Sequence, residues 1–211
     1  RWHREQWQFL DHARRSKVRS IWLDELIRST ITGRQIKMNK DGLHVFCDMD
    51  GVLANHDKQA TEFGVKLPRD ENSEEGFKYE ISDYHNDFFL TMPTMPDFAV
   101  LEEWMSTIPH SQTHILSAVP KRRTSALSVY DEKKQWVKDK MPWFRTRNIH
   151  IVFREHKQLF PKEYRHAILI DDNMTNVQEW RTCGGIGILH INAKETVRKA
   201  KQVFSALQSL I

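Results

Sequence analysis

Residues 45–56 read Val-Phe-Cys-Asp-Met-Asp-Gly-Val-Leu-Ala-Asn-His, and this stretch decides which fold we expect. Its apolar start is typical of a buried strand in a parallel sheet. Asp48 and Asp50 follow, and both are costly to bury unless a cation or hydrogen bonds compensate them. Gly51 then allows a sharp turn. The stretch predicts a strand end that presents Asp48 as nucleophile and metal ligand and Asp50 as proton carrier. A solvated turn rich in Asp is the alternative.

Two further apolar segments also end in polar side chains. Residues 113–117 read Thr-His-Ile-Leu-Ser, and residues 167–173 read Ala-Ile-Leu-Ile-Asp-Asp-Asn. Ligands of open α/β sheets bind where the carboxyl ends of parallel strands meet, so these segments predict one shared site. Four carboxylates, one hydroxyl and one ammonium suit Mg²⁺ and a phosphate group. The residues expected there are Asp48, Asp50, Ser117, Lys157, Asp171 and Asp172.

In their order along the chain, these residues resemble the four motifs of the haloacid dehalogenase-like phosphatase superfamily. The first motif is similar to residues 48–52, the second to Ser117, the third to Lys157 and the fourth to the pair Asp171-Asp172. The resemblance covers roughly residues 43–195. It implies an α/β fold with a Rossmann-like parallel sheet, helices on both faces and a small cap insert. The alternation of strand and helix patterns after residue 97 favours the same sheet.

The resemblance also implies the chemistry of a phosphomonoesterase that depends on Mg²⁺. Asp48 is expected to attack phosphorus and form an aspartyl-phosphate, while Asp50 exchanges protons with the leaving group and with water. The implied metal ligands are Asp48, Asp50 through its backbone carbonyl, Asp171 and Asp172. The implied phosphate-binding residues are Ser117 and Lys157, with Lys133 as the competing candidate for the lysine.

Within that superfamily, two elements resemble the 5'(3')-deoxyribonucleotidases. One is residues 88–96, which begin Phe-Phe-Leu and carry prolines at 93 and 96, and the other is residues 132–137, Glu-Lys-Lys-Gln-Trp-Val. They imply that the substrate is a small-molecule phosphomonoester, and in particular a nucleotide. Phe88 and Phe89 are the residues expected to stack on its base. Packing of these rings in a small cap core is the alternative. Lys121 follows Ser117 closely, so it is a candidate contact for phosphate or sugar oxygens.

Other functions stay open at this point. Residues 177–181 resemble the phosphatase half of phage polynucleotide kinase-phosphatases, which act on 3'-phosphate ends. Residues 1–42 hold 10 Lys or Arg against 5 Asp or Glu, together with three tryptophans. They predict a helical extension, which either packs on the core or binds nucleic acid by pairing Arg with stacked Trp rings. A non-catalytic nucleic-acid-binding module is the remaining alternative.

Composition indicates a globular α/β protein. The 211 residues are 39% hydrophobic, enough for a sizeable core, and no apolar run approaches the roughly 18 residues of a membrane helix. Two cysteines do not indicate a disulfide framework, which favours a reducing cytoplasm. A formal net charge of +4 permits anionic substrates. We expect a helical extension over residues 1–42 and a core over 43–211, with a cap insert near 53–96.

Overall fold

The computed structural model describes residues 42–63, 87–119, 126–164 and 166–208. Within these residues, five strands form one parallel sheet in the order β3-β2-β1-β4-β5. The strands are β1 (Leu43–Cys47), β2 (Thr113–Val119), β3 (Ile149–Phe153), β4 (His166–Asp171) and β5 (Ile186–Leu189). The sheet confirms the predicted α/β class. The predicted helical extension, apart from residue 42, and the middle of the insert lie outside the described residues, so they stay predictions.

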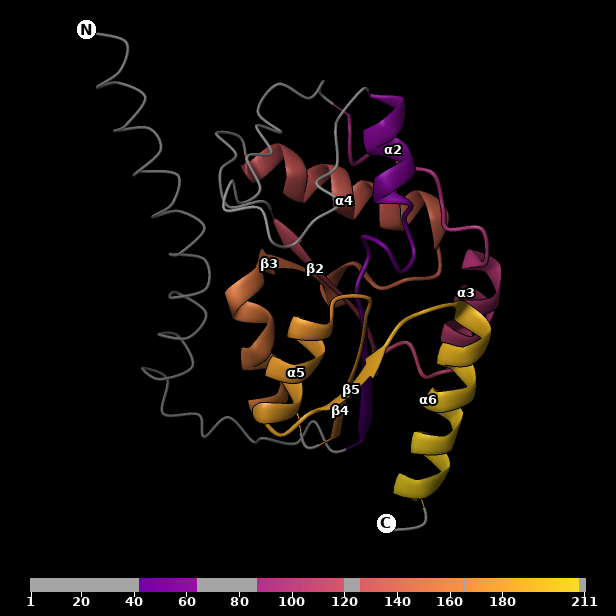
Figure 1. Ribbon diagram of the computed structural model, residues 1–211, viewed down its shortest axis with the longest axis vertical. Coiled ribbons are helices and arrows are strands. Elements are labelled where there is room, and N and C mark those ends of the chain that lie inside the picture. Colours follow the sequence, from indigo (N-terminus) through magenta and orange to yellow (C-terminus); the bar gives the residue numbers. More distant parts are fainter. Residues whose placement is uncertain (1–41, 64–86, 120–125, 165, 209–211) are drawn as a thin grey trace, which may run out of the picture. The chain divides into compact units, whose positions relative to one another are not determined.

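Helices cover both faces of this sheet. One layer holds α3 (Phe98–Ser106), α4 (Ala126–Lys140) and α6 (Ala193–Gln208). The other holds α5 (Met174–Thr182) and the 3₁₀ helix η3 (Arg154–Lys162). Figure 1 shows α5 on one side of the strands, with α3 and α6 on the opposite side. Two shorter helices complete the described elements, α2 (His56–Glu62) in the insert and η2 (Thr146–Asn148) before β3.

Alternation along the strands divides the core into two clusters. Val45 and Cys47 of β1 point to the cluster shared with α3, α4 and α6. Phe46, which lies between them, points to the opposite cluster with Trp180 of α5 and Phe160 of η3. Side chains of successive strand residues point to opposite faces, so a strand buried on both sides needs apolar residues at every position. This requirement explains the apolar runs 45–47 in β1 and 167–170 in β4.

A row of three histidines crosses the sheet on the same face as Phe46. His44 of β1 lies beside His114 of β2, with 3.0 Å between His44 Nδ1 and His114 Nε2. The second nitrogen of His114 lies 3.1 Å from Nε2 of His150 on β3. His44 and His114 are both buried. The parallel register brings these three rings together from distant parts of the sequence.

Some element boundaries differ from the predicted ones. Strand β2 continues beyond Leu116, its predicted end, through Ser117 to Val119, because Ser117 and Val119 still pair with Ile151 and Phe153. Strand β5 ends at Leu189. The next residue, His190, makes one last bond from its backbone N–H to the carbonyl of Asp171 at 2.9 Å. No helix among the described residues is long and apolar enough to cross a membrane.

Candidate functional site

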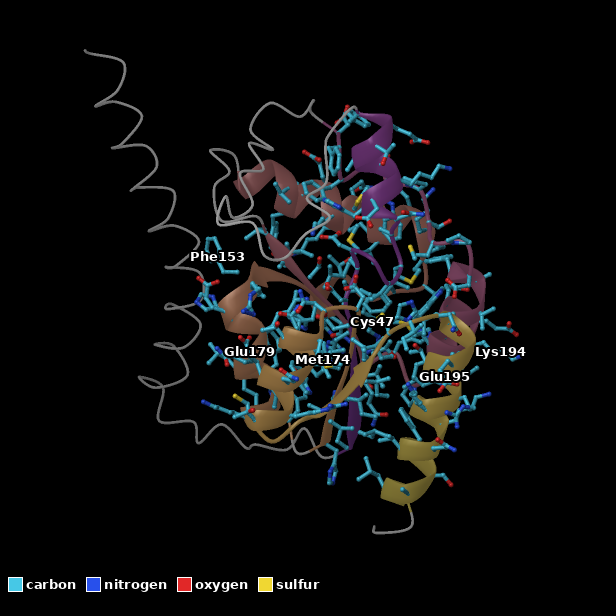
Figure 2. The ribbon with its side chains drawn as sticks, viewed as in Figure 1. Cys47, Phe153, Met174, Glu179, Lys194 and Glu195 are labelled. Carbon is cyan, nitrogen blue, oxygen red and sulfur yellow. The ribbon has the colours of Figure 1, made fainter. Side chains whose placement is uncertain are left out.

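The candidate site begins with a tight turn after β1. The backbone N–H of Asp48 donates to the carbonyl of Ile170 at 2.8 Å and extends the pairing with β4. The Met49 carbonyl then accepts bonds from the backbone N–H groups of Leu53 and Ala54, at 2.9 and 2.8 Å. This wrapping holds Asp48 at the end of the central strand. Figure 2 marks the preceding residue, Cys47, in the interior of the fold between α5 and α6.

Gly51 is the point at which this turn meets the end of β4. Its φ is +76°, and a Cβ at this position would collide with the carboxylate of Asp172. Only glycine adopts such a backbone conformation at little cost and also leaves this space free. The glycine predicted to allow a sharp turn therefore also lets the two acidic strand ends approach each other.

Three carboxylates meet where β1 and β4 end. Asp48, Asp171 and Asp172 each offer one oxygen, and these oxygens lie within 4.8 Å of one another. Asp48 and Asp171 are buried, at 6% and 0% exposure, whereas Asp172 is open to solvent. Hard oxygen ligands at this spacing could hold a metal ion.

The pKa values of Asp48 and Asp172 indicate that negative charge at this site is poorly compensated. Burial raises the pKa of Asp48 to about 8, because the opposing attraction of Lys157 does not outweigh burial and the charge of Asp171. Although Asp172 as a whole residue is exposed, its carboxyl group lies against Gly51, and this partial burial, together with the charge of Asp171, raises the pKa of Asp172 to about 6. The site as described holds more negative charge than its own lysines neutralise.

Lys157 is the cation at the centre of the cluster. It comes from η3, and only 3% of it is exposed. Its Nζ lies 2.8 Å from Oδ2 of Asp48 and 2.8 Å from Oδ2 of Asp171. Burial lowers the pKa of this ammonium, but the two carboxylates raise it further and hold it above its usual range. Lys157 therefore stays charged.

A second lysine joins Asp50 and Ser117 to the site. Lys133 of α4 is fully buried, and its Nζ donates to Oδ2 of Asp50 at 2.5 Å and to Oγ of Ser117 at 2.9 Å. The other oxygen of Asp50, Oδ1, is buried and has no hydrogen-bond partner among the described residues. Four carboxylates thus face two ammonium groups. When all four carboxyl groups are ionised, two negative charges are left over, which equals the charge of one divalent cation.

Asp171 is held by residues that the sequence analysis did not single out. Asn176 Nδ2 donates to both of its carboxylate oxygens at 3.0 Å. Arg154 Nη1 donates to Oδ1 of Asn176 at 3.1 Å, and Glu179 accepts two bonds from the Arg154 guanidinium at 2.8 and 2.9 Å. The sequence holds one indication of the role of Asn176, which is its position three residues after Asn173. Asn173 caps α5 with its side chain, so Asn176 lies in the first turn of that helix, next to the strand end.

The two aromatic residues that were predicted to contact the substrate are buried. Phe88 and Phe89 are 0% and 1% exposed and pack against each other, with 5.0 Å between ring centroids. Phe88 also contacts the ring of His56. Such burial agrees with the core-packing alternative, and contact of these rings with a substrate stays a prediction. Lys121 lies outside the described residues.

No model of a known protein family matches the chain, and no curated protein matches it either. The structure itself shows a carboxylate cluster that could hold a metal ion, at the end of strands in a parallel α/β sheet.

Proposed function

We propose that this protein is an Mg²⁺-dependent phosphomonoesterase of the haloacid dehalogenase type. The observation that carries the proposal is the position of the Lys157 ammonium, 2.8 Å from both Asp48 and Asp171. The proposed nucleophile Asp48, the proposed metal ligand Asp171 and the ammonium of Lys157 thus lie together at the carboxyl ends of β1 and β4. Ser117 and Asp50 lie beside them, joined by Lys133. These are the parts that phosphoryl transfer needs for positioning and charge stabilisation.

The proposed reaction has two balanced steps. An oxygen of Asp48 forms a bond to phosphorus as the ester P–O bond breaks, and protonated Asp50 gives its proton to the leaving alkoxide. Asp50, now a carboxylate, then takes a proton from water as that water attacks the aspartyl-phosphate. This second step restores Asp48 as a carboxylate and releases inorganic phosphate. Ser117 and Lys157 donate hydrogen bonds to the phosphoryl oxygens in both steps.

The residues present fit a divalent cation. The close spacing of Asp48, Asp171 and Asp172 and the raised pKa values of Asp48 and Asp172 indicate negative charge that the described residues do not balance. Asp48, Asp171 and Asp172 would hold the ion, together with the backbone carbonyl of Asp50. When bound, Mg²⁺ would neutralise these carboxylates and draw charge from the phosphoryl group.

Among phosphomonoesters, we propose a nucleotide as substrate. The support is that the two sequence elements resembling 5'(3')-deoxyribonucleotidases contact each other. Glu132 accepts a bond from the backbone N–H of Phe89 at 3.0 Å, and Trp136 Nε1 donates to the Met92 carbonyl at 2.7 Å. Their joint appearance in the sequence thus corresponds to one structural unit beside the site.

A phosphate-release panel tests the proposal. The panel contains Mg²⁺ and covers nucleoside 5'- and 3'-monophosphates, sugar phosphates, para-nitrophenyl phosphate and 3'-phosphorylated oligonucleotides. We expect release from nucleoside monophosphates, and loss of that release in EDTA or in Asp171→Asn. Preference for oligonucleotide ends would replace the nucleotide with the nucleic-acid alternative. Absence of release from every ester, or full activity of metal-free protein in EDTA, would refute the proposed function.

A further inference from the structure

All three N–H groups of the Lys133 ammonium have acceptors within the protein. They donate to Oδ2 of Asp50 at 2.5 Å, to Oγ of Ser117 at 2.9 Å and to the carbonyl of Ala118 at 2.8 Å. A lysine ammonium carries three N–H groups and no acceptor. Lys133 therefore has no N–H left for a phosphoryl oxygen unless one of these bonds breaks.

Lys157 has fewer acceptors for its ammonium N–H groups than Lys133. Its Nζ contacts Oδ2 of Asp48 and Oδ2 of Asp171, which leaves one N–H without an acceptor among the described residues. An incoming phosphoryl oxygen can take that third position. The two buried lysines are therefore suited to different tasks, although the sequence presented them as competitors for one.

Packing on both sides fixes the position of Lys133. The residue before it, Glu132, accepts from the backbone N–H of Phe89, and Trp136 one turn later donates to the Met92 carbonyl. The Lys133 ammonium also lies 4.7 Å from the centroid of the Phe89 ring. With 0% exposure, the side chain has little room to reach another partner.

The bonds of Lys133 determine what Asp50 and Ser117 can offer. Because Oδ2 of Asp50 accepts from Lys133, the buried and unpartnered Oδ1 is the oxygen left to carry a proton. Because an ammonium only donates, Ser117 Oγ must accept, and its own hydroxyl hydrogen is left to donate to phosphate.

We propose that Lys133 is a positioning residue, which orients the Asp50 carboxyl group and the Ser117 hydroxyl and does not itself bind the phosphate. This inference rests on the proposed phosphatase function. As the Asp48–phosphorus bond forms and the ester bond breaks, the proton on Asp50 Oδ1 passes to the alkoxide. Asp50 becomes a carboxylate, whose charge the Lys133 ammonium stabilises.

Leaving-group dependence distinguishes the two roles of Lys133. In Lys133→Met, kcat on a nucleoside monophosphate, whose alkoxide needs a proton, should fall roughly 10²-fold, within the range of general acid catalysis. The loss on para-nitrophenyl phosphate, whose leaving group needs little protonation, should be several-fold at most, and KM should change little on either substrate. Lys134→Met is the matched control with unchanged kinetics, because Lys134 contacts only the Tyr130 side chain among the described residues.

Coupling to Asp50 gives a second readout. If Lys133 acts through Asp50, the double variant Lys133→Met/Asp50→Asn should lose little more on the nucleotide than Asp50→Asn alone. Lys133→Gln, which is shorter and neutral, replaces the Met variant if melting curves show that the latter does not fold. It should show the same dependence on the leaving group.

Two results would overturn the inference, and they differ in meaning. Equal losses on both substrates, with a raised KM and weaker inhibition by inorganic phosphate, would show that Lys133 binds phosphate directly while the proposed function stands. A wild-type protein without activity on any phosphomonoester would overturn the proposed function and this inference together.

Discussion

At the scale of single residues, Asp48 combines burial with a negative charge that the described residues do not fully compensate. We predict that Asp48→Asn lowers phosphatase turnover at least roughly 10³-fold, because a neutral amide cannot attack phosphorus. The fold should survive, and the melting temperature in EDTA should not fall, because burial already disfavours the charged form of Asp48. Asp139→Asn, at an exposed position of α4, is the control. Substantial residual turnover by a clean preparation would exclude Asp48 as the nucleophile.

Gly51 and Gly184 form a matched pair of positions. Both have positive φ, at +76° and +91°, but only at Gly51 would a Cβ collide with the carboxylate of Asp172, since nothing lies within 4 Å of a Cβ at Gly184. We predict that alanine at either position costs about 1–2 kcal/mol in the free energy of unfolding. Only Gly51→Ala should also weaken Mg²⁺ binding, measured by titration calorimetry. Equal metal affinity in both variants would mean that the Gly51–Asp172 approach has no part in the site.

At the scale of elements, the first turn of α5 acts on the end of β4. Asn176→Ala removes the amide that donates to both oxygens of Asp171, so only Lys157 and the backbone N–H of Asn173 still orient this carboxylate. We predict that Mg²⁺ affinity falls roughly 10–100-fold, the usual effect of removing a group that orients a metal ligand. Thr175→Ala, an exposed neighbour in the same turn, should bind Mg²⁺ as the wild type does. Unchanged affinity in Asn176→Ala would show that Lys157 and the backbone suffice to hold Asp171.

Part of the arrangement of strands could be predicted from the sequence. The strands that lead to Asp48 and Asp171 were predictable, because strands buried on both faces need continuous apolar runs and a polar residue marks their end. That Asp48, Ser117 and Asp171 share one rim also followed, because a parallel sheet brings the carboxyl ends of its strands together.

The contacts of Lys133, Arg154 and Asn176 were not predictable in the same way. Each depends on how a helix is rotated and placed against the sheet, and that is decided by packing over the whole core. Ser117 illustrates the smaller errors, since its polar side chain suggested a strand end although β2 continues for two more residues. Propensity and polarity describe local preferences, which sheet pairing overrides.

At the scale of the whole molecule, the site links stability to pH and metal. In the folded, metal-free protein the pKa values of Asp48 and Asp172 are about 8 and about 6. In the unfolded chain, both side chains lose their protons near the ordinary Asp pKa of about 4. Their contribution to stability is therefore largest in acid and is lost as pH rises toward 8. Mg²⁺ needs the deprotonated carboxylates, so its affinity should rise over the same range.

We predict that the melting temperature in Mg²⁺ minus that in EDTA widens from pH 5.5 to pH 8. Comparing the two conditions at each pH reduces contributions from groups outside the site, such as His190, whose pKa is lowered by burial. Thermal unfolding at matched ionic strength measures this difference, and the double variant Asp48→Asn/Asp172→Asn should show little change with pH. A difference that narrows with rising pH would contradict the carboxylate site.

The histidine row has a consequence for the state of its protons. A neutral imidazole carries one N–H, and His114 uses both of its nitrogens, so if it donates to one neighbour it must accept from the other. If His114 donates to His44, all three rings carry their hydrogen on Nε2; if it donates to His150, all three carry it on Nδ1. When all three rings are neutral, they are therefore always the same tautomer, and a change of tautomer in one ring requires the same change in the other two. The nitrogen chemical shifts of any one ring report the polarity of a hydrogen-bonded line that crosses three strands.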